Sequence, residues 1–228
     1  MCILFIYTEP NPPKGGYRLI LATNRDEYYK RQAECAFHCT ETNIIGGRDM
    51  EYGKEGGMWM GVSLNKIFRL GCLLNVTGEP HADNVEGRGS IVLNYLEEVV
   101  RSEDYIEILN KRSFNAFNLV TVELSDNNAV VYHHSNAPQS SSKYEGRQIL
   151  GFGNSTVETP LQKVIEGKKK FTQILDLSSE KSMLITKLTE LLKDKKRYLP
   201  DAELQRRTAA YEHLSSIYVE TGVGYGTR

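Results

Sequence analysis

The chain is poor in the features that mark three large classes of protein. It has four cysteines in 228 residues, too few and too scattered for a disulfide framework or a zinc site. No apolar run approaches the roughly 18 residues that cross a bilayer. Basic and acidic residues nearly cancel, 28 against 29, so the basic surplus of a nucleic-acid-binding protein is missing. We therefore predict a cytoplasmic protein of a reducing compartment, with no nucleic-acid partner, no metal site and no transmembrane segment.

The first residues also lack the marks of a targeting signal. No positive charge precedes the apolar run that starts at Ile3, and Glu9-Pro10 ends that run early. A secretory signal needs the positive charge, and a transit peptide would be rich in arginine. We expect neither kind of leader.

The most informative residue that is present is Cys2, directly after the initiator Met1. Cysteine is small, so this methionine is of the kind that is normally removed, which would leave Cys2 with a free α-amine. The amine titrates near 7.7–8.0 and a thiol near 8.5, so the amine can accept the thiol proton. One residue would then supply a nucleophile and its base. The alternative is a cysteine that packs as a small hydrophobe in an edge strand.

Hydrophobic patterning predicts strands that arrive as hairpins. Turn residues between residues 3–8 and 17–23 indicate a first antiparallel pair. Other expected strands are residues 58–64, 68–75, 115–124, 129–135, 147–152 and 211–220, and residues 138–146 are expected to form an exposed loop.

Helices are expected between these strands. One begins at Gly89-Ser90, a second covers residues 103–111, and two more follow residue 160. The first places Val92, Leu96, Val99 and Val100 on one face. Hairpins cannot form a purely parallel sheet, so the pattern favours one α+β domain of stacked antiparallel sheets covered by helices.

Polar residues cluster where the second strand ends. Burying Asn24-Arg25-Asp26-Glu27 is costly unless these groups are paired. Because the first two strands are antiparallel, the end of the second lies beside the start of the first, within reach of Cys2. A guanidinium there would favour the thiolate, and a carboxylate could orient the amine. The alternative is a surface ion pair of little consequence.

Two asparagines, Asn75 and Asn154, also follow predicted strands. An amide at a strand end is a candidate oxyanion donor, worth roughly 3–4 kcal/mol to acyl transfer. The alternative for each is an ordinary turn residue. Arg88 precedes a helix that could hold an anion, and Trp59 is more typical of a core than of a ligand platform.

An ordered set of motifs resembles the NRDE family, also known as the transport and Golgi organisation protein 2 family. The motifs follow the family's order over essentially the whole chain: Met1-Cys2-Ile3, Asn24-Arg25-Asp26-Glu27, Gly46-Gly47-Arg48-Asp49, Gly56-Gly57-Met58-Trp59-Met60-Gly61-Val62-Ser63, Leu74-Asn75, Gly87-Arg88-Gly89, Phe117-Asn118-Leu119 and Gly224-Tyr225-Gly226-Thr227-Arg228.

This resemblance implies a fold of the N-terminal-nucleophile hydrolase type, a four-layer αββα sandwich. Its wider class includes choloylglycine hydrolases and penicillin V acylases, which cut amide bonds with an N-terminal cysteine. Carried onto this chain, the pattern gives the catalytic candidates Cys2, Arg25, Asp26, Asn75, Asn154 and Arg228. The remaining motif residues give the ligand-binding candidates Asn24, Glu27, Trp59, Arg88 and Asn118.

The resemblance also implies a role in haem mobilisation, in lipid and mitochondrial metabolism, and in Golgi organisation. We therefore expect a small hydrophobic or acyl-type ligand, with haem as a candidate, no cofactor for catalysis, and mitochondrial or Golgi association. Three functions stay open: a handler of haem or another lipophile, a Cys2 hydrolase of an amide or thioester, and a scaffold without chemistry.

Three departures from the family pattern accompany the resemblance. Met58 stands where the family usually has threonine, and Asn65-Lys66-Ile67 replaces a Gly-Lys turn. The family continues past the final motif with further strands, whereas this chain stops at Arg228. We therefore expect residues 1–228 to form a single domain shortened at its C-terminus, with an unpaired sheet edge.

Overall fold

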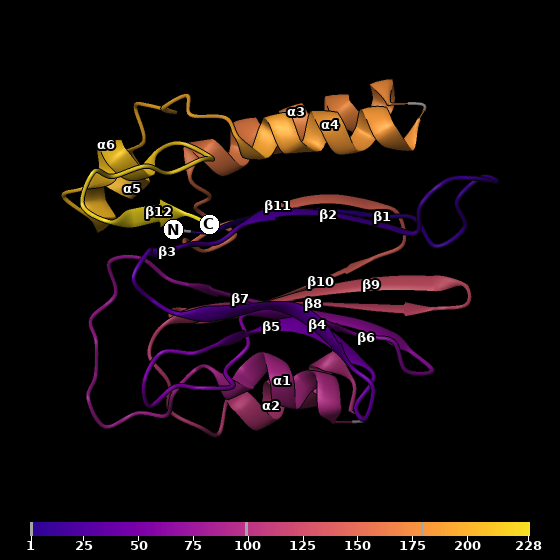
Figure 1. Ribbon diagram of the computed structural model, residues 1–228, viewed down its shortest axis with the longest axis horizontal. Helices are drawn as coiled ribbons and strands as arrows, with labels where there is room; N and C mark the ends of the chain where they lie inside the picture. Colours follow the sequence, from indigo (N-terminus) through magenta and orange to yellow (C-terminus); the bar gives the residue numbers. More distant parts are fainter. Residues whose placement is uncertain (1, 99, 179) are drawn as a thin grey trace. The chain divides into compact units, whose positions relative to one another are not determined.

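A computed structural model describes residues 2–98, 100–178 and 180–228. The chain divides into two compact units, each containing an antiparallel sheet and helices (Figure 1). Unit 1 is formed by the start of the chain up to Thr8, Leu19–Lys30 and Gln148–Arg228, and unit 2 by Glu9–Arg18 and Arg31–Arg147. These helices and antiparallel sheets confirm the predicted mixed α and β class. The four-layer sandwich stays a prediction.

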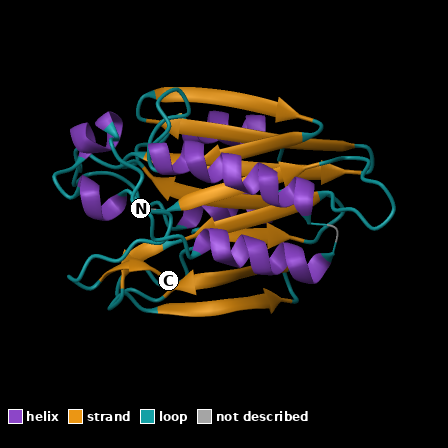
Figure 2. Cartoon of the chain, turned by 90° about the horizontal axis from the view of Figure 1, so that it is seen from above, coloured by secondary structure: helices purple, strands orange, loops and turns teal. Residues whose placement is uncertain are grey.

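Unit 1 is built on the three-stranded sheet β11-β1-β2. Its strands are β1 (Ile3–Thr8), β2 (Leu19–Asn24) and β11 (Gln148–Phe152), and the expected first hairpin is present. Helices α3 (Gln162–Leu177) and α4 (Lys181–Leu192) lie side by side over this sheet (Figure 2). Ile3 and Phe5 point into the core beneath them, where the Phe5 and Phe171 rings stack with centroids 5.7 Å apart.

The end of unit 1 adds a second, two-stranded sheet. In it β12 (Tyr225–Thr227) pairs with β3 (Asp26–Tyr28), the strand that follows β2. The strand expected over residues 211–220 is wrong, because α6 (Tyr211–Leu214) begins there and the true strand comes later. The preceding helix α5 (Ala202–Arg207) is capped by the Asp201 carboxylate, which accepts from the Leu204 N–H at 2.9 Å.

Unit 2 is a seven-stranded antiparallel sheet in the order β10-β9-β8-β7-β6-β5-β4. Helices α1 (Ser90–Glu97) and α2 (Ser102–Leu109) pack on the face of this sheet that carries Phe117 and Leu119. The strand bounds are β4 (Ala33–Cys39), β5 (Ile44–Asp49), β6 (Met60–Ser63), β7 (Phe68–Asn75), β8 (Phe117–Ser125), β9 (Asn128–Asn136) and β10 (Gln139–Glu145).

Two parts of this sheet depart from the sequence interpretation. The loop expected over residues 138–146 is instead the edge strand β10, which pairs with β9 along its whole length. The serines of β10 suggested a loop, because an edge strand with one face toward water needs few apolar residues. Strand β4 was not predicted for the same reason, since nearly all its residues are exposed.

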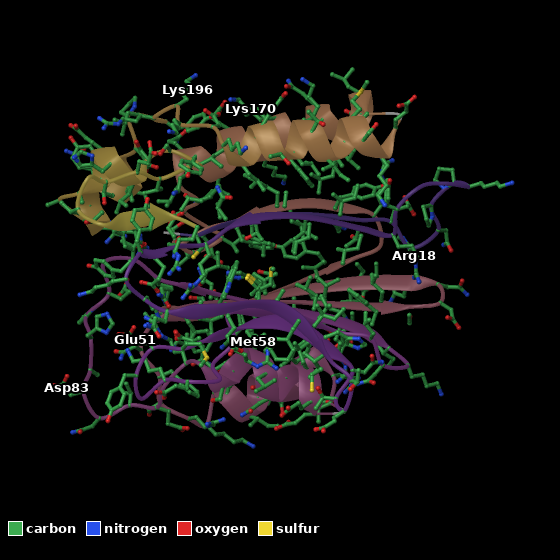
Figure 3. The ribbon with its side chains drawn as sticks, in the orientation of Figure 1. Arg18, Glu51, Met58, Asp83, Lys170 and Lys196 are labelled. Atoms are coloured by element: carbon green, nitrogen blue, oxygen red, sulfur yellow. The ribbon has the colours of Figure 1, made fainter. Side chains whose placement is uncertain are left out.

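The predicted face of the first helix is confirmed in part. Val92 and Leu96 are buried on α1, Val100 follows the helix, and Val99 lies outside the described residues. Met58, one of the three departures from the family pattern, is buried in the same core as Val92 and Leu96 (Figure 3). It fills the space left by Gly46 and Gly61, where a Cβ would lie 2.8 and 2.3 Å from its side chain.

Candidate functional site

The ends of three strands in unit 1 bring candidate residues around Cys2. Strand β1 is the middle strand, with Ile3 opposite Asn24 of β2 and Leu4 opposite Phe152 of β11. Continuing both registers puts Cys2 beside Arg25 on one side and Asn154 on the other. The Cys2 carbonyl oxygen lies 4.0 Å from the position of a Cβ on Gly153, which agrees with this register. Arg25 directly follows β2, whereas Asn154 lies in a bend after β11, where strand alternation no longer fixes the direction of its side chain.

Asn24 fixes the end of β2. Its side-chain amide donates to the carbonyl oxygens of Leu192 at 2.8 Å and Ile217 at 3.0 Å, and the residue is buried. Both amide protons are thus used inside unit 1, where they tie the strand to the end of α4 and to the segment before β12. In this structure Asn24 anchors the neighbouring Arg25 and Asp26.

Asp26 is a buried carboxylate held by the last strand. Its Oδ1 accepts from the Thr227 hydroxyl at 2.6 Å, and its carbonyl oxygen accepts from the Tyr225 hydroxyl at 3.2 Å. The Thr227 oxygen in turn accepts from the Val219 N–H at 2.8 Å. The sequence interpretation missed Tyr225 and Thr227, although both belong to the closing motif from which it took only Arg228.

Arg25 is paired with a neighbour rather than turned to open solvent. Its Nη2 lies 3.5 Å from Glu27 Oε2, and both side chains are less than one-fifth exposed, at 15% and 17%. The backbone N–H of Arg228 donates to the Arg25 carbonyl at 2.9 Å, which closes the chain end onto this turn. The Arg228 guanidinium itself donates to the Tyr28 carbonyl at 3.3 Å and is exposed.

The thiol of Cys2 is in an environment that opposes ionisation. Burial is the largest influence and raises its pKa above the ordinary value, and the Asp26 carboxylate adds to the rise. The positive charge of the amino terminus, a hydrogen bond from the Asp26 backbone N–H and the Arg25 guanidinium all lower the pKa, but the balance is upward. The expected influence of Arg25 therefore has the predicted direction and is outweighed by burial.

This balance sets the pH dependence of Cys2 alkylation. We expect iodoacetamide to label Cys2 with a midpoint above the ordinary thiol value of about 8.5, because only the thiolate reacts. Peptide-resolved mass spectrometry over a pH series measures that midpoint separately from the exposed Cys35. A Cys2 midpoint below that of Cys35 would contradict the burial argument.

A further residue of this cluster, Lys163, was not expected from the sequence. It lies in the first turn of α3, is fully buried, and donates from Nζ to the Ser216 carbonyl at 3.0 Å. Burial lowers its pKa, while the charges of Asp26 and Cys2 act in the opposite direction. Lysines are usually on the solvated face of a helix, so no pattern in the sequence indicated that this one is buried.

The other four candidates belong to unit 2. Asn118 is fully buried on β8, opposite Leu74, whereas Asn75 is exposed at the end of β7, opposite Phe117. Alternation along β8 therefore directs the Asn75 and Asn118 side chains to opposite faces of the sheet. The Arg88 guanidinium donates to the Ala116 carbonyl, and Trp59 is half-buried. The predicted roles of these residues stay predictions.

The described residues contain no cluster of three or more His, Cys, Asp or Glu side chains that could hold a metal ion. Within the same ranges no helix is long and apolar enough to cross a bilayer; α3, with 16 residues, falls short. Haem needs only one or two axial ligands, so its binding stays a prediction.

Comparison with known proteins places this arrangement in a family. The model of the family described as Transport and Golgi organisation 2 matches residues 1–228. Transport and Golgi organization protein 2 of Drosophila melanogaster is 36% identical over 244 residues, covering 100% of this chain and 85% of the relative. The Homo sapiens and Mus musculus homologues are 34% and 33% identical, each covering 100% of this chain and 86% of the relative. The chain belongs to the Transport and Golgi organisation 2 family, as the motif order indicated.

Proposed function

We propose that this protein is a hydrolase that uses Cys2 as the nucleophile on an amide or thioester. One observation carries the proposal. The β1–β2 register, continued by one residue, puts Cys2 beside Arg25, and the Arg25 guanidinium and the Asp26 backbone both act to lower the pKa of the Cys2 thiol. A cation next to a thiol favours the thiolate, which is the nucleophilic form.

In the acylation step the Cys2 thiolate attacks the substrate carbonyl carbon and a C–S bond forms. The carbonyl electron pair moves to oxygen and then returns, breaking the C–N or C–S bond of the substrate. The α-amine of a mature chain beginning at Cys2 accepts the thiol proton and passes it to the leaving amine or thiolate. Water then adds to the acyl-enzyme, the amine accepts and returns its proton, and the acid leaves.

The neighbours of Cys2 have separate roles in this proposal. The amide of Asn154, one strand away, is the candidate donor to the oxyanion. Arg25 stabilises the thiolate, and the backbone of Asp26, whose side chain is held by Thr227, also lowers the pKa of the thiol. Because burial keeps the thiol protonated at neutral pH, the base is essential to this mechanism.

Two measurements on the unaltered protein test the proposal. Intact-mass analysis is expected to give a mature chain that lacks Met1, because a chain beginning at Met1 has no amine on Cys2. A thioester acyl probe is then expected to leave one acyl group on the N-terminal peptide. Retention of Met1, or labelling only at Cys35 and Cys39, would refute the amine-assisted mechanism.

Handling of haem or another lipophile is the alternative proposal. The names of the relatives refer to transport and Golgi organisation, which suits a carrier as well as an enzyme. Haem titration separates the two. A Soret shift that persists in Cys2→Ala, together with no acyl adduct on the wild-type protein, favours the carrier. An adduct at Cys2 and an unchanged haem spectrum favour the hydrolase.

A further inference from the structure

The two helices over the sheet of unit 1 expose apolar side chains where α3 ends and α4 begins. Leu177, the last residue of α3, is 78% exposed, and Met183 and Ile185, near the start of α4, are 44% and 54% exposed. A helix of a globular protein normally turns such side chains toward its core. Apolar side chains that gather on one part of the surface indicate a contact site.

The exposed apolar surface continues into a groove between the two helices. The groove has a volume of about 560 Å³, and Leu177 and Met183 line it together with Ile174 and Leu191. A volume in this range is typical of sites that accept an apolar group. The apolar surface is therefore continuous from the end of α3 into the space between α3 and α4.

The same stretch of chain carries a local excess of positive charge. Residues 162–197 contain ten of the 28 Lys and Arg residues of the chain, but only five of its 29 Asp and Glu residues. One of the ten, Lys163, is buried. Because the whole chain has a net charge of −1, this excess is a feature of the α3–α4 region and would attract an anionic surface to it.

Several of these positive charges are available to a partner. Lys170 pairs with Asp194 at 2.6 Å, whereas Lys168, Lys193 and Lys196 are exposed and form no ion pair within the ranges that the structure describes. Lys196 lies on the side of the two helices that faces away from the β11-β1-β2 sheet (Figure 3). Unpaired ammonium groups thus lie on the helices that also expose the apolar side chains.

We propose that α3 and α4 form a docking surface for an anionic lipid bilayer. Leu177, Met183 and Ile185 enter the boundary between headgroups and acyl chains, and the exposed lysines face the lipid phosphates. The residue types favour a bilayer over a protein partner. Protein interfaces are depleted in lysine and rich in Trp, Tyr and Arg, whereas lysine beside aliphatic residues suits the lipid interface.

The first test is co-sedimentation of the full chain with lipid vesicles. We expect binding to vesicles of phosphatidylcholine and phosphatidylserine, and binding at least about tenfold weaker to pure phosphatidylcholine. About 0.5 M NaCl should weaken binding to the anionic vesicles, because salt screens the lysines. Equal binding to both vesicles would overturn the proposal. Binding to neither would reject the bilayer and leave an acidic protein as the partner.

The second test removes the apolar contact. Leu177→Ser combined with Met183→Ser is expected to weaken binding to the anionic vesicles about tenfold, since two side chains no longer gain from burial in the lipid. Both positions are exposed, and circular dichroism checks that the variant folds. Val223→Ser, at an 80% exposed position of the same unit, is the control and should bind like wild type. Wild-type binding by the double variant would contradict the proposal.

The third test reverses charge on the two helices. Lys168→Glu combined with Lys193→Glu should abolish most binding to the anionic vesicles. Lys14→Glu combined with Lys111→Glu changes the net charge by the same amount at exposed positions of unit 2, and is the matched control. If both pairs weaken binding equally, net charge rather than this surface is responsible, and the proposal fails.

A second copy of the chain is the other occupant that these measurements separate. A wild-type dimer in light scattering that Leu177→Ser dissociates would show an interface between copies and reject the bilayer. Vesicle binding needs no thiol, so Cys2→Ala should bind like wild type. The proposed hydrolase and the docking surface can therefore fail independently.

Discussion

Cys2→Ala is expected to abolish acyl-enzyme formation and to lower hydrolysis of a thioester substrate about a thousandfold or more. Alanine removes the atom that forms the C–S bond, and no neighbouring group can replace it, because Asp26 and Arg25 already pair with Thr227 and Glu27. Release of free thiol from an acyl thioester measures the rate. Circular dichroism checks that the fold is kept.

Two matched variants sharpen this prediction. Cys35→Ala removes an exposed thiol on β4 and should leave turnover unchanged. Cys2→Ser keeps a nucleophilic oxygen and the α-amine, so a slow residual rate is expected. If Cys2→Ala hydrolyses the thioester as fast as wild type, Cys2 is not the nucleophile and the carrier function becomes the better proposal.

The second large effect is expected from Gly167→Ala, in the middle of α3. A Cβ on this residue would lie 2.3 Å from Phe5 Cζ and 2.9 Å from its Cε1. The Phe5 ring cannot move aside easily, because it is buried and stacked on Phe171. Alanine gains about 1 kcal/mol of helix propensity over glycine, whereas overpacking a close-packed core costs about 1–3 kcal/mol or more. At 2.3 Å we expect the cost to lie at the upper end of this range and to exceed the gain, for a net loss of stability of about 1–2 kcal/mol.

Denaturant unfolding measures this loss, and a second substitution tests its cause. Phe5→Leu removes the ring atoms that meet the new methyl group, so it should recover part of the stability when combined with Gly167→Ala. Lys168→Ala is the control, since it changes an exposed position of the same helix. Unchanged or increased stability of Gly167→Ala would mean that α3 does not approach β1 this closely.

Local patterns in the sequence were enough to predict several elements. Strand β7 has the predicted bounds, Phe68–Asn75, because a continuous apolar run with turn residues before it admits few other structures. The β1–β2 hairpin followed from two apolar runs and the turn residues between them. Strands β4 and β10 could not be found in this way, because sheet edges need little hydrophobic patterning.

The sequence by itself determined the family, the antiparallel first hairpin and, through that hairpin, the neighbourhood of Cys2 and Arg25. These features are local or lie in motifs with a fixed order. Only the tertiary structure brought Thr227 to Asp26, since their hydrogen bond joins residues 201 positions apart. The tertiary structure also decided that burial raises the pKa of the Cys2 thiol by more than the nearby positive charges lower it. Burial depends on how distant segments of the chain pack, so it cannot be read from a linear motif.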